Sequence, residues 1–399
     1  MMESATPSKS PVVHSRVLQV ASTFTSRPLA ASLQPFLASA GVADAVEFVE
    51  YGQVSEYMLG AQSEAANIPG TLVLIRLEDC LRTELKAASI GPEVSQRARQ
   101  TLTLHVEAFH KQITSLAQRG KPVWLLLCPS DGWIAETYKL APLLRTYANL
   151  LLARLRGTPR VTVLNWPSSF PLAELYDRNA DRLGQIPFTS EGFAQLGQFL
   201  GPEIETGLAS RSEISAPQAG DGTQELAKFL AALAVRVRMA RAKPEDRSHL
   251  DRILRTAAAF SLTGEKRDLS DAEVDSLLRS DGCYVISVSD RLSNYGPSGV
   301  VAFHGDAESL VIGALALSCP VLGKQVEYAV ISGLAQIARA QGCSLLVFAY
   351  KASGRNQIML KFLQSLAGPA SQISFILQAA EAEEQIRRVA IAPGAWTLD

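Results

Sequence analysis

A short loop late in the chain carries the clearest chemical signal. Residues Pro320–Gln325 (PVLGKQ) lie between an apolar strand expected over 309–317 and a helix expected over 326–341. The unpaired N–H groups and the positive dipole end at a helix N-terminus attract phosphate. Gly323 lets a ligand come close to the backbone, and Lys324 adds a positive charge. We therefore expect this loop to bind a phosphate group.

Groups that could transfer protons or attack a carbonyl lie on both sides of the loop. They are Tyr295, Asp290, Glu327 and Cys319. A thiol near a helix N-terminus can have a lowered pKa, which favours the reactive thiolate. Cys319 also follows an apolar strand, so an inert buried thiol is the alternative interpretation. We predict Tyr295, Asp290 and Cys319 as the catalytic residues.

The first half of the chain shows the pattern of a parallel α/β sheet. Short apolar runs, typical of buried strands, alternate with longer helical patterns. The expected strands cover 17–21, 45–51, 71–75, 123–127 and 161–164, and the expected helices cover 29–40, 96–119, 134–155 and 192–208. This order predicts a doubly wound sheet with right-handed crossovers. Ligands bind beyond the carboxyl ends of such strands, so Trp133 and Trp166 are candidates for a recognition surface, with buried packing as the alternative.

A segment rich in Ser, Gly and Pro separates the two halves. Residues 209–223 have no apolar period, which is typical of a linker. Three helical patterns follow and are interpreted as a connector, over 224–241, 249–260 and 270–278. In the last of them, Ser270 and Glu273 have the spacing of a capping box.

From Cys283 onward the elements change to an α+β order. Strands are expected at 283–290, 299–304, 309–317, 344–350 and 373–378, with helices at 326–341 and 357–366. This is the order expected of the acetyltransferase (GNAT) fold. We therefore predict an α/β protein with an N-terminal doubly wound parallel sheet and a C-terminal GNAT-like α+β domain. Its parts are a disordered tail (1–16), the first domain (17–208), a linker (209–223), a helical connector (224–279) and the GNAT-like domain (280–399).

Composition and charge exclude several classes of protein. The 399 residues carry a net charge of −1, which gives no long-range field to hold nucleic acid or anionic lipid. Residues 1–16 lack the apolar run of a signal peptide, and the apolar runs elsewhere are too short to cross a bilayer. The five cysteines are scattered and form no metal-binding pattern, which favours reduced thiols. We expect a cytoplasmic protein that binds no metal, nucleic acid or membrane.

Short segments in both halves follow one another in a specific order. They are Thr23–Thr25 (TFT), Ile75–Asp79 (IRLED), Asp181–Phe188 (DRLGQIPF), Phe260–Arg267 (FSLTGEKR), Ser289–Arg291 (SDR) and Ser318–Glu327 (SCPVLGKQVE). Together they resemble the FkbH-like family of natural-product biosynthesis, whose full-length members join SGNH-like, HAD phosphatase-like and GNAT-like domains. The paired-Asp HAD signature does not occur here, and the segment between Gly201 and Val285 is too short for that domain. The glycerate chemistry linked to it therefore does not carry over.

The resemblance implies a degraded SGNH hydrolase site in the first domain. The implied site residues are Ser22, Thr23, Asn165, Asp181 and Gln185. Gln185 takes the place of the catalytic histidine, and glutamine has no titrating nitrogen to act as a general base. His105 and His110 could substitute, but both lie in the helix expected over 96–119, where a surface or capping role is usual. We expect no esterase activity.

The resemblance also implies a site for acyl-CoA or a phosphopantetheine thioester in the second domain. The thioester would lie along a V-shaped gap at 318–324. Pro320 and Gln325 depart from the family's [QR]xxGx[GA] pattern, so we expect weak binding of free acyl-CoA. Asn356 matches an Asn that commonly follows the next strand, with a helix N-cap as the alternative. The predicted cofactor-binding residues are Val321, Leu322, Gly323, Lys324, Gln325 and Asn356.

Two functions remain open on the sequence. The first is an acyltransferase-like accessory protein of polyketide-type biosynthesis that acts on, or docks to, an acyl carrier protein or another biosynthetic enzyme. The second is a non-catalytic adaptor in which both sites are degraded. Gln185, Pro320 and Gln325 favour the adaptor, whereas the retained segments Ser289–Arg291 and Val321–Gly323 favour a site still in use.

Overall fold

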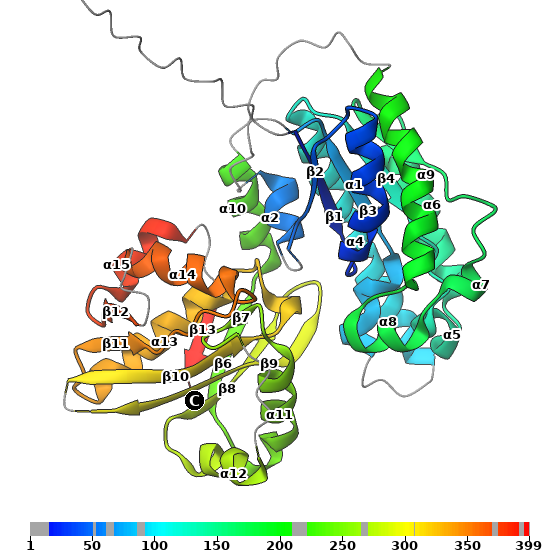
Figure 1. Ribbon diagram of the computed structural model, residues 1–399. Coiled ribbons are helices and arrows are strands. Elements are labelled where there is room, and N and C mark those ends of the chain that lie inside the picture. The colour runs from blue at the N-terminus through cyan, green and yellow to red at the C-terminus, as the bar shows by residue number, and fades with distance from the viewer. Residues whose placement is uncertain are drawn as a thin grey trace, which may run out of the picture.

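Two sheets organise the chain into two halves (Figure 1). The computed structural model describes residues 16–50, 53–60, 68–85, 92–209, 222–264, 270–306, 308–368, 374–390 and 395–398. The predicted tail up to residue 15, and residues 210–221 of the predicted linker, lie outside the described residues. So do Tyr51 and the segment 265–269.

The sheet of the first half is parallel throughout, in the order β2-β1-β3-β4-β5. Its strands are β1 (Val17–Ser22), β2 (Ala45–Phe48), β3 (Thr71–Ile75), β4 (Val123–Leu127) and β5 (Val161–Leu164). Central strands such as β3 are buried along their whole length, because helices cover both faces. The predicted doubly wound sheet is confirmed.

Helices cover this sheet on two sides. They are η1 (Arg27–Leu29), α1 (Ala30–Ser39), α2 (Val54–Leu59), η2 (Leu77–Leu81), α3 (Arg82–Leu85), α4 (Pro92–Gln118), α5 (Trp133–Tyr138), α6 (Ala141–Leu155), α7 (Leu172–Leu175), α8 (Arg178–Gly184) and α9 (Ser190–Ala209). One core joins α1 and α9 to the sheet through residues such as Leu33 and Leu196. The other joins α4 and α6 through residues such as Leu102 and Leu151. The helix predicted over 134–155 is broken, because Lys139 adopts a left-handed conformation and ends α5.

The sheet of the second half is mixed, in the order β12-β11-β10-β9-β8-β6-β13, with β7 paired to β10. Its strands are β6 (Arg236–Arg241), β7 (Phe260–Ser261), β8 (Cys283–Ser289), β9 (Asn294–Gly305), β10 (Ser309–Leu317), β11 (Leu345–Phe348), β12 (Phe375–Gln378) and β13 (Ala395–Leu398). β10 and β11 run parallel, while β8, β9 and β10 are antiparallel neighbours. The α+β class predicted for this half is confirmed, and the strands predicted from Cys283 onward correspond to β8–β12, whereas β6, β7 and β13 were not predicted.

The helices of the second half pack around this sheet. They are α10 (Gly222–Leu233), η3 (Pro244–Asp246), α11 (Arg247–Thr256), α12 (Asp271–Arg279), η4 (Cys319–Val321), α13 (Val326–Ala340), α14 (Gln357–Ala367) and α15 (Ala382–Val389). The capping box at the start of α12 is confirmed: Ser270 Oγ accepts from the Glu273 amide at 3.3 Å, and Glu273 accepts from the Ser270 amide at 2.7 Å. Among the described helices, none is both long and apolar enough to span a membrane.

The predicted helical connector is wrong over part of its length. The pattern expected as one helix over 224–241 forms α10 and then β6, with Ala234 in a left-handed conformation between them. In β6, arginines alternate with buried residues such as Val237 and Met239, which is the two-residue period of a strand. β6 pairs with β8 and β13, so this segment belongs to the second sheet.

The two halves contact each other directly. α10 lies beside α2 (Figure 1), and Leu59 of α2 belongs to the same buried core as Leu226 and Leu230. On another element, the Glu84 carboxylate accepts hydrogen bonds from Ser293 Oγ at 2.9 Å and from the Asn294 amide at 2.8 Å. These contacts position the end of one sheet against the loops of the other.

Candidate functional site

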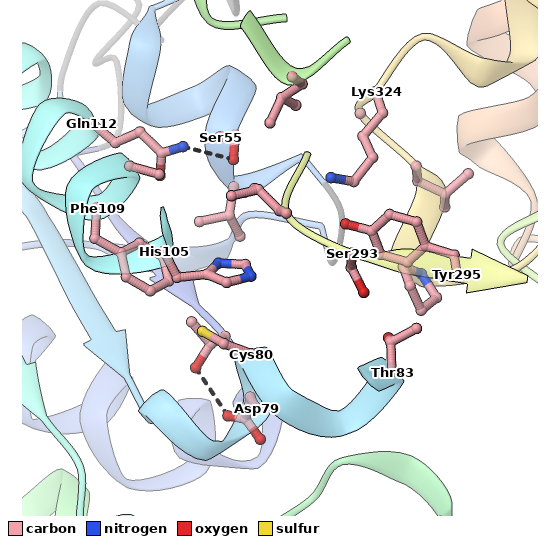
Figure 2. Close-up of a pocket in the computed structure, with 18 of the residues that line it drawn as sticks. Ser55, Asp79, Cys80, Thr83, His105, Phe109, Gln112, Ser293, Tyr295 and Lys324 are labelled. Atoms are coloured by element: carbon pink, nitrogen blue, oxygen red, sulfur yellow. Dashed lines mark hydrogen bonds between the residues drawn. The ribbon is translucent and has the colours of Figure 1, made fainter. Parts of the chain in front are cut away.

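Some residues of each predicted site line one cavity between the halves (Figure 2). The cavity has a volume of about 170 Å³. Ser22 and Thr23 line it from the carboxyl end of β1, together with side chains of α2, η2 and α4. Gly323 and Lys324 line it from the loop before α13, together with residues of α10 and of the β8–β9 turn. No pattern in the sequence indicates that these segments meet.

Three predicted residues of the second half come together at this cavity. Lys324 Nζ donates to Asp290 Oδ2 at 2.7 Å, and Tyr295 Oη donates to the same oxygen at 3.2 Å. Lys324 Nζ also lies 4.9 Å from the centre of the Tyr295 ring. The amides of Leu292 and Ser293 donate to Asp290 Oδ1, at 2.7 and 2.9 Å, and fix the carboxylate. Burial, and then the negative charge of Asp290, raise the pKa of Tyr295, so its hydroxyl stays protonated.

The loop before α13 keeps only part of its predicted binding capacity. The Val321 amide donates to the Ser318 carbonyl and the Leu322 amide to the Cys319 carbonyl, both at 3.2 Å, so the prediction is wrong for these two. In the described chain, no group accepts from the amides of Gly323 or Lys324. Gly323 has a φ of +71°, which favours glycine. The backbone N–H groups that remain available to a ligand are therefore those of Gly323 and Lys324, and both residues line the cavity.

Gln325 and Asn356 do not serve as predicted. The Gln325 side chain is buried away from the cavity, at the N-cap of α13. Asn356 is fully buried: its Oδ1 accepts from Tyr350 Oη and the Ser353 amide, and its Nδ2 donates to the Ser261 and Lys351 carbonyls. It stands at the N-cap of α14, but its side chain makes no capping bond. Asn356 is a structural residue, with its hydrogen-bonding groups occupied inside the protein.

The V-shaped gap predicted for the thioester is filled by the chain itself. β10 pairs with β11 only as far as Ile312 and Phe348. Beyond that point β7 pairs with the end of β10, the Leu262 amide donates to the Leu315 carbonyl, and the Lys351 amide donates to the Leu262 carbonyl. A ligand cannot lie between these strands without displacing β7, so the cavity between the halves is the open site.

Cys319 and Glu327 lie outside the cavity lining. Burial raises the pKa of the Cys319 thiol, which disfavours the predicted reactive thiolate. Burial raises the pKa of Glu327 to about 8, and its Oε2 has no hydrogen-bond partner. Neither group contributes to the chemistry at the cavity.

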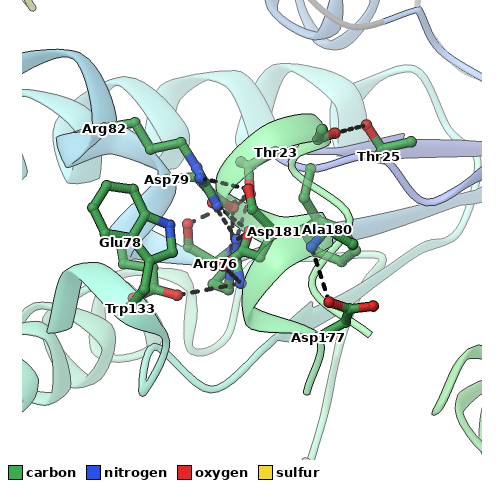
Figure 3. Close-up of polar contacts among 12 residues, drawn as sticks. Thr23, Thr25, Arg76, Glu78, Asp79, Arg82, Trp133, Asp177, Ala180 and Asp181 are labelled. Carbon is green, nitrogen blue, oxygen red and sulfur yellow. Dashed lines mark hydrogen bonds and ion pairs between the residues drawn. The ribbon is translucent and has the colours of Figure 1, made fainter. Parts of the chain in front are cut away.

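Two of the predicted SGNH residues, Thr23 and Asp181, belong to a buried polar network (Figure 3). Thr23 Oγ1 donates to Asp79 Oδ2 and accepts from the Arg76 amide, both at 3.0 Å. Arg76 binds Asp181 through two nitrogens, at 2.6 and 3.1 Å, and Tyr176 Oη donates to Asp181 at 2.7 Å. These hydrogen bonds hold Thr23 and Asp181 in fixed positions.

Asp181 has no histidine to orient. Burial acts to raise its pKa, but the hydrogen bond and charge of Arg76, followed by the charge of Arg82, hold that pKa below its usual range. Gln185 ends α8 in a left-handed conformation, and Asn165 is exposed. Ser22 Oγ donates to the Phe24 carbonyl at 2.7 Å. The predicted triad positions are thus not assembled for nucleophilic catalysis.

His105 is a cavity residue that the sequence analysis placed on the surface (Figure 2). Burial, and then the positive charge of Lys324, lower its pKa to about 4, so the imidazole is neutral at pH 7. Phe109 and Gln112 line the cavity from the same helix. Their spacing of i, i+4 and i+7 puts the three on one face of α4, and this spacing was the available signal. His110 does not line the cavity.

The two tryptophans predicted as a recognition surface pack within the first half. The Trp166 ring lies 4.9 Å from that of Phe170 and 5.9 Å from that of Phe188. The Arg82 guanidinium lies 5.9 Å from the ring of Trp133. Neither tryptophan lines the cavity, and the ring contacts of Trp166 favour the packing alternative for that residue.

Comparison with known proteins gives little further information. No protein-family model and no curated protein matches the chain. Two structures of N-acetylglutamate synthase from Neisseria gonorrhoeae are similar to it: one with coenzyme A and N-acetyl-glutamate (11% identity, 88% of each chain), and one with coenzyme A and L-arginine (12% identity, 93% of this chain and 99% of the other). Both have a TM-score of 0.24, which is below the level of a shared fold. The fold assignment therefore rests on strand order.

Proposed function

We propose that the protein binds a small acyl thioester in the cavity between its halves. In this proposal it is an acyltransferase-type accessory protein of natural-product biosynthesis, resembling the FkbH-like family, and the thioester is presented by coenzyme A or by the phosphopantetheine arm of an acyl carrier protein. The observation that carries the proposal is the place of Gly323 and Lys324. Their amides have no partner in the described chain, and both residues line the cavity.

The charges and donors at the cavity suit a thioester carbonyl. Lys324 has two N–H groups besides the one that binds Asp290, and the neighbouring amides add further donors. Donors fixed in place in a cavity with little water stabilise negative charge on a carbonyl oxygen. His105 stays neutral at pH 7, so the site also offers an unprotonated nitrogen, while the Tyr295 hydroxyl already donates to Asp290.

The volume of the cavity limits the size of the ligand that can enter it. A cavity of about 150 Å³ holds a benzene-sized molecule, so the 170 Å³ measured here suits a short acyl group with the end of its arm. The nucleotide of coenzyme A would remain outside. This agrees with the loop, where two of four predicted amides are already paired and cannot bind phosphate.

A second candidate, a non-catalytic adaptor, is favoured by one specific observation. β7 fills the gap between β10 and β11, and Asn356 holds it there through the Ser261 carbonyl. An adaptor would bind a carrier protein or another biosynthetic enzyme through its surface and would need no open cleft. The two candidates differ in whether a free thioester binds.

Calorimetry separates the candidates. We expect acetyl-CoA, malonyl-CoA or a phosphopantetheinylated carrier protein to bind the wild type, and Lys324→Met to weaken that binding about tenfold, because a hydrogen bond to a charged group is lost. Lys361→Met, an exposed lysine on α14, is the matched control and should bind as the wild type does. If no thioester gives heat, the acyl-thioester proposal is wrong. A carrier complex in gel filtration would then favour the adaptor.

A further inference from the structure

One face of α4 lies across the cavity from the loop before α13 (Figure 2). His105, Phe109 and Gln112 line the cavity from this face, and Ser55 of α2 lies next to Gln112. The first half therefore forms one wall of the cavity, and Lys324 lies on the opposite wall. This wall was not part of either predicted site.

Gln112 carries an unsatisfied polar atom at the cavity. Its side chain is 2% exposed, and its Nε2 donates to Ser55 Oγ at 3.0 Å. Its Oε1 has no hydrogen-bond partner. Buried acceptors are nearly always paired, so an unpaired one that borders a cavity indicates a donor brought by a ligand.

The surroundings of Gln112 define the chemistry of that donor. Val54, Ala108, Phe109 and Phe229 are apolar residues of the same lining, and the imidazole of His105 is neutral. The Asp79 carboxylate also lines the cavity, but Arg76, Arg82 and Thr23 already bind it, so a charged ammonium would lose its hydration there without a free opposite charge to compensate. A neutral N–H group, such as that of an amide, loses less hydration free energy on burial, and one hydrogen-bond acceptor satisfies it.

We propose that Gln112 accepts a hydrogen bond from the amide N–H at the cysteamine end of a thioester arm. This rests on the proposed function and extends it. The thioester carbonyl faces Lys324 and Gly323, two methylene groups cross the apolar middle of the cavity, and the amide reaches Gln112. The ligand recognised is thus an N-acylcysteamine thioester unit, and both halves of the protein contact it.

Two small ligands test this directly. S-acetyl-N-acetylcysteamine contains the amide N–H, and S-acetyl-2-mercaptoethyl acetate replaces that N–H with an ester oxygen. We expect the wild type to bind the amide about five- to tenfold more tightly by calorimetry, the effect of one hydrogen bond. Gln112→Leu should bind both ligands equally. Gln118→Leu, an exposed glutamine on the same helix, should behave as the wild type.

Each result has one interpretation. Equal binding of the two ligands by the wild type overturns the role of Gln112 while leaving the proposed function intact, and this measurement needs no folded variant. A preference for the amide that persists in Gln112→Leu also overturns it. If the wild type binds neither ligand nor acetyl-CoA, the proposed function fails, and this inference fails with it. A preference that disappears only in Gln112→Leu supports the assignment.

Discussion

The buried polar residues around Arg76 and those around the cavity differ in how completely they pair with one another. In the first half, Arg76 contacts Asp79 and Asp181, and Thr23 bonds to both the Arg76 amide and the Asp79 carboxylate. Around the cavity, Lys324 contacts only Asp290 among the described carboxylates. Neither the Gly323 amide nor Gln112 Oε1 has a hydrogen-bond partner in the part of the chain that the structure describes.

This difference separates a structural site from a binding site. Arg76 is almost fully buried and joins residues from η2 and α8, so the network fixes the ends of the first sheet. Most polar groups of these side chains are bonded to each other and are not available to a ligand. The unpaired atoms at the cavity have not been satisfied within the chain, and they are the ones that a ligand can reach. The comparison therefore predicts opposite effects of mutation in the two regions.

The largest effect is expected from Arg76→Met. This change removes the cation that faces three buried carboxylates, Glu78, Asp79 and Asp181. Breaking a buried ion pair from one side costs about 3–5 kcal/mol, because a charge remains buried without compensation. Urea denaturation measures the free energy of unfolding. Arg27→Met, which breaks the exposed pair with Glu50, is the control and should cost less than about 1 kcal/mol. Equal losses in both variants would contradict the comparison.

Glu327→Gln should stabilise the protein at alkaline pH. Its folded pKa of about 8 is above the ordinary value of 4.5, so the stability it provides is complete below pH 4.5 and is lost as the pH rises through about 8. Glutamine cannot ionise, and we expect a gain of about 4 kcal/mol at pH 8 and little change at pH 4.5. Denaturation at both pH values measures this. Glu381→Gln, beside α15, serves as control, and a gain of the same size at both pH values would count against the explanation.

His105 should make stability fall in acid. Its folded pKa of about 4 is below the ordinary value of 6.5, so the unfolded chain binds the proton first, and stability decreases as the pH falls from 6.5 towards 4. Between pH 7 and pH 5 we expect the free energy of unfolding to fall by about 1–2 kcal/mol less in His105→Asn than in the wild type. His110→Asn, on the same helix but outside the cavity lining, should leave the profile unchanged. If the free energy of unfolding depends on pH in the same way in the wild type and in His105→Asn, the assignment of this effect to His105 is wrong.

The smallest effect is expected from Gln185→His. Restoring a histidine at this position should not create an esterase, because Asp181 is held by Arg76 and Arg82 and Thr23 is bonded to Asp79. Hydrolysis of p-nitrophenyl acetate should stay within twofold of the wild type. Gln118→His is the control for an added imidazole. A tenfold increase specific to Gln185→His would mean that the network of the first half can reorganise.

Local pattern was sufficient for most of the architecture. The apolar runs of β3 and β4 and the Ser270–Glu273 spacing gave the correct elements, because each depends on residues close together in the chain. The helix predicted over 224–241 was wrong, because this one amphipathic stretch forms two elements, α10 and β6. A helical period and a strand period are hard to separate over six residues, and pairing with β8 decides the outcome.

The sequence by itself determined the two α/β halves, the order of their strands, and the loss of a histidine at Gln185. Only the tertiary structure decided which polar groups remain available. Arg76 and Asp181 are 105 positions apart, and Lys324 meets a cavity that His105 and Gln112 line from the other half. Hydrogen bonds and burial are set by neighbours in space, and a side chain's capacity to bind a ligand depends on those neighbours more than on its own type.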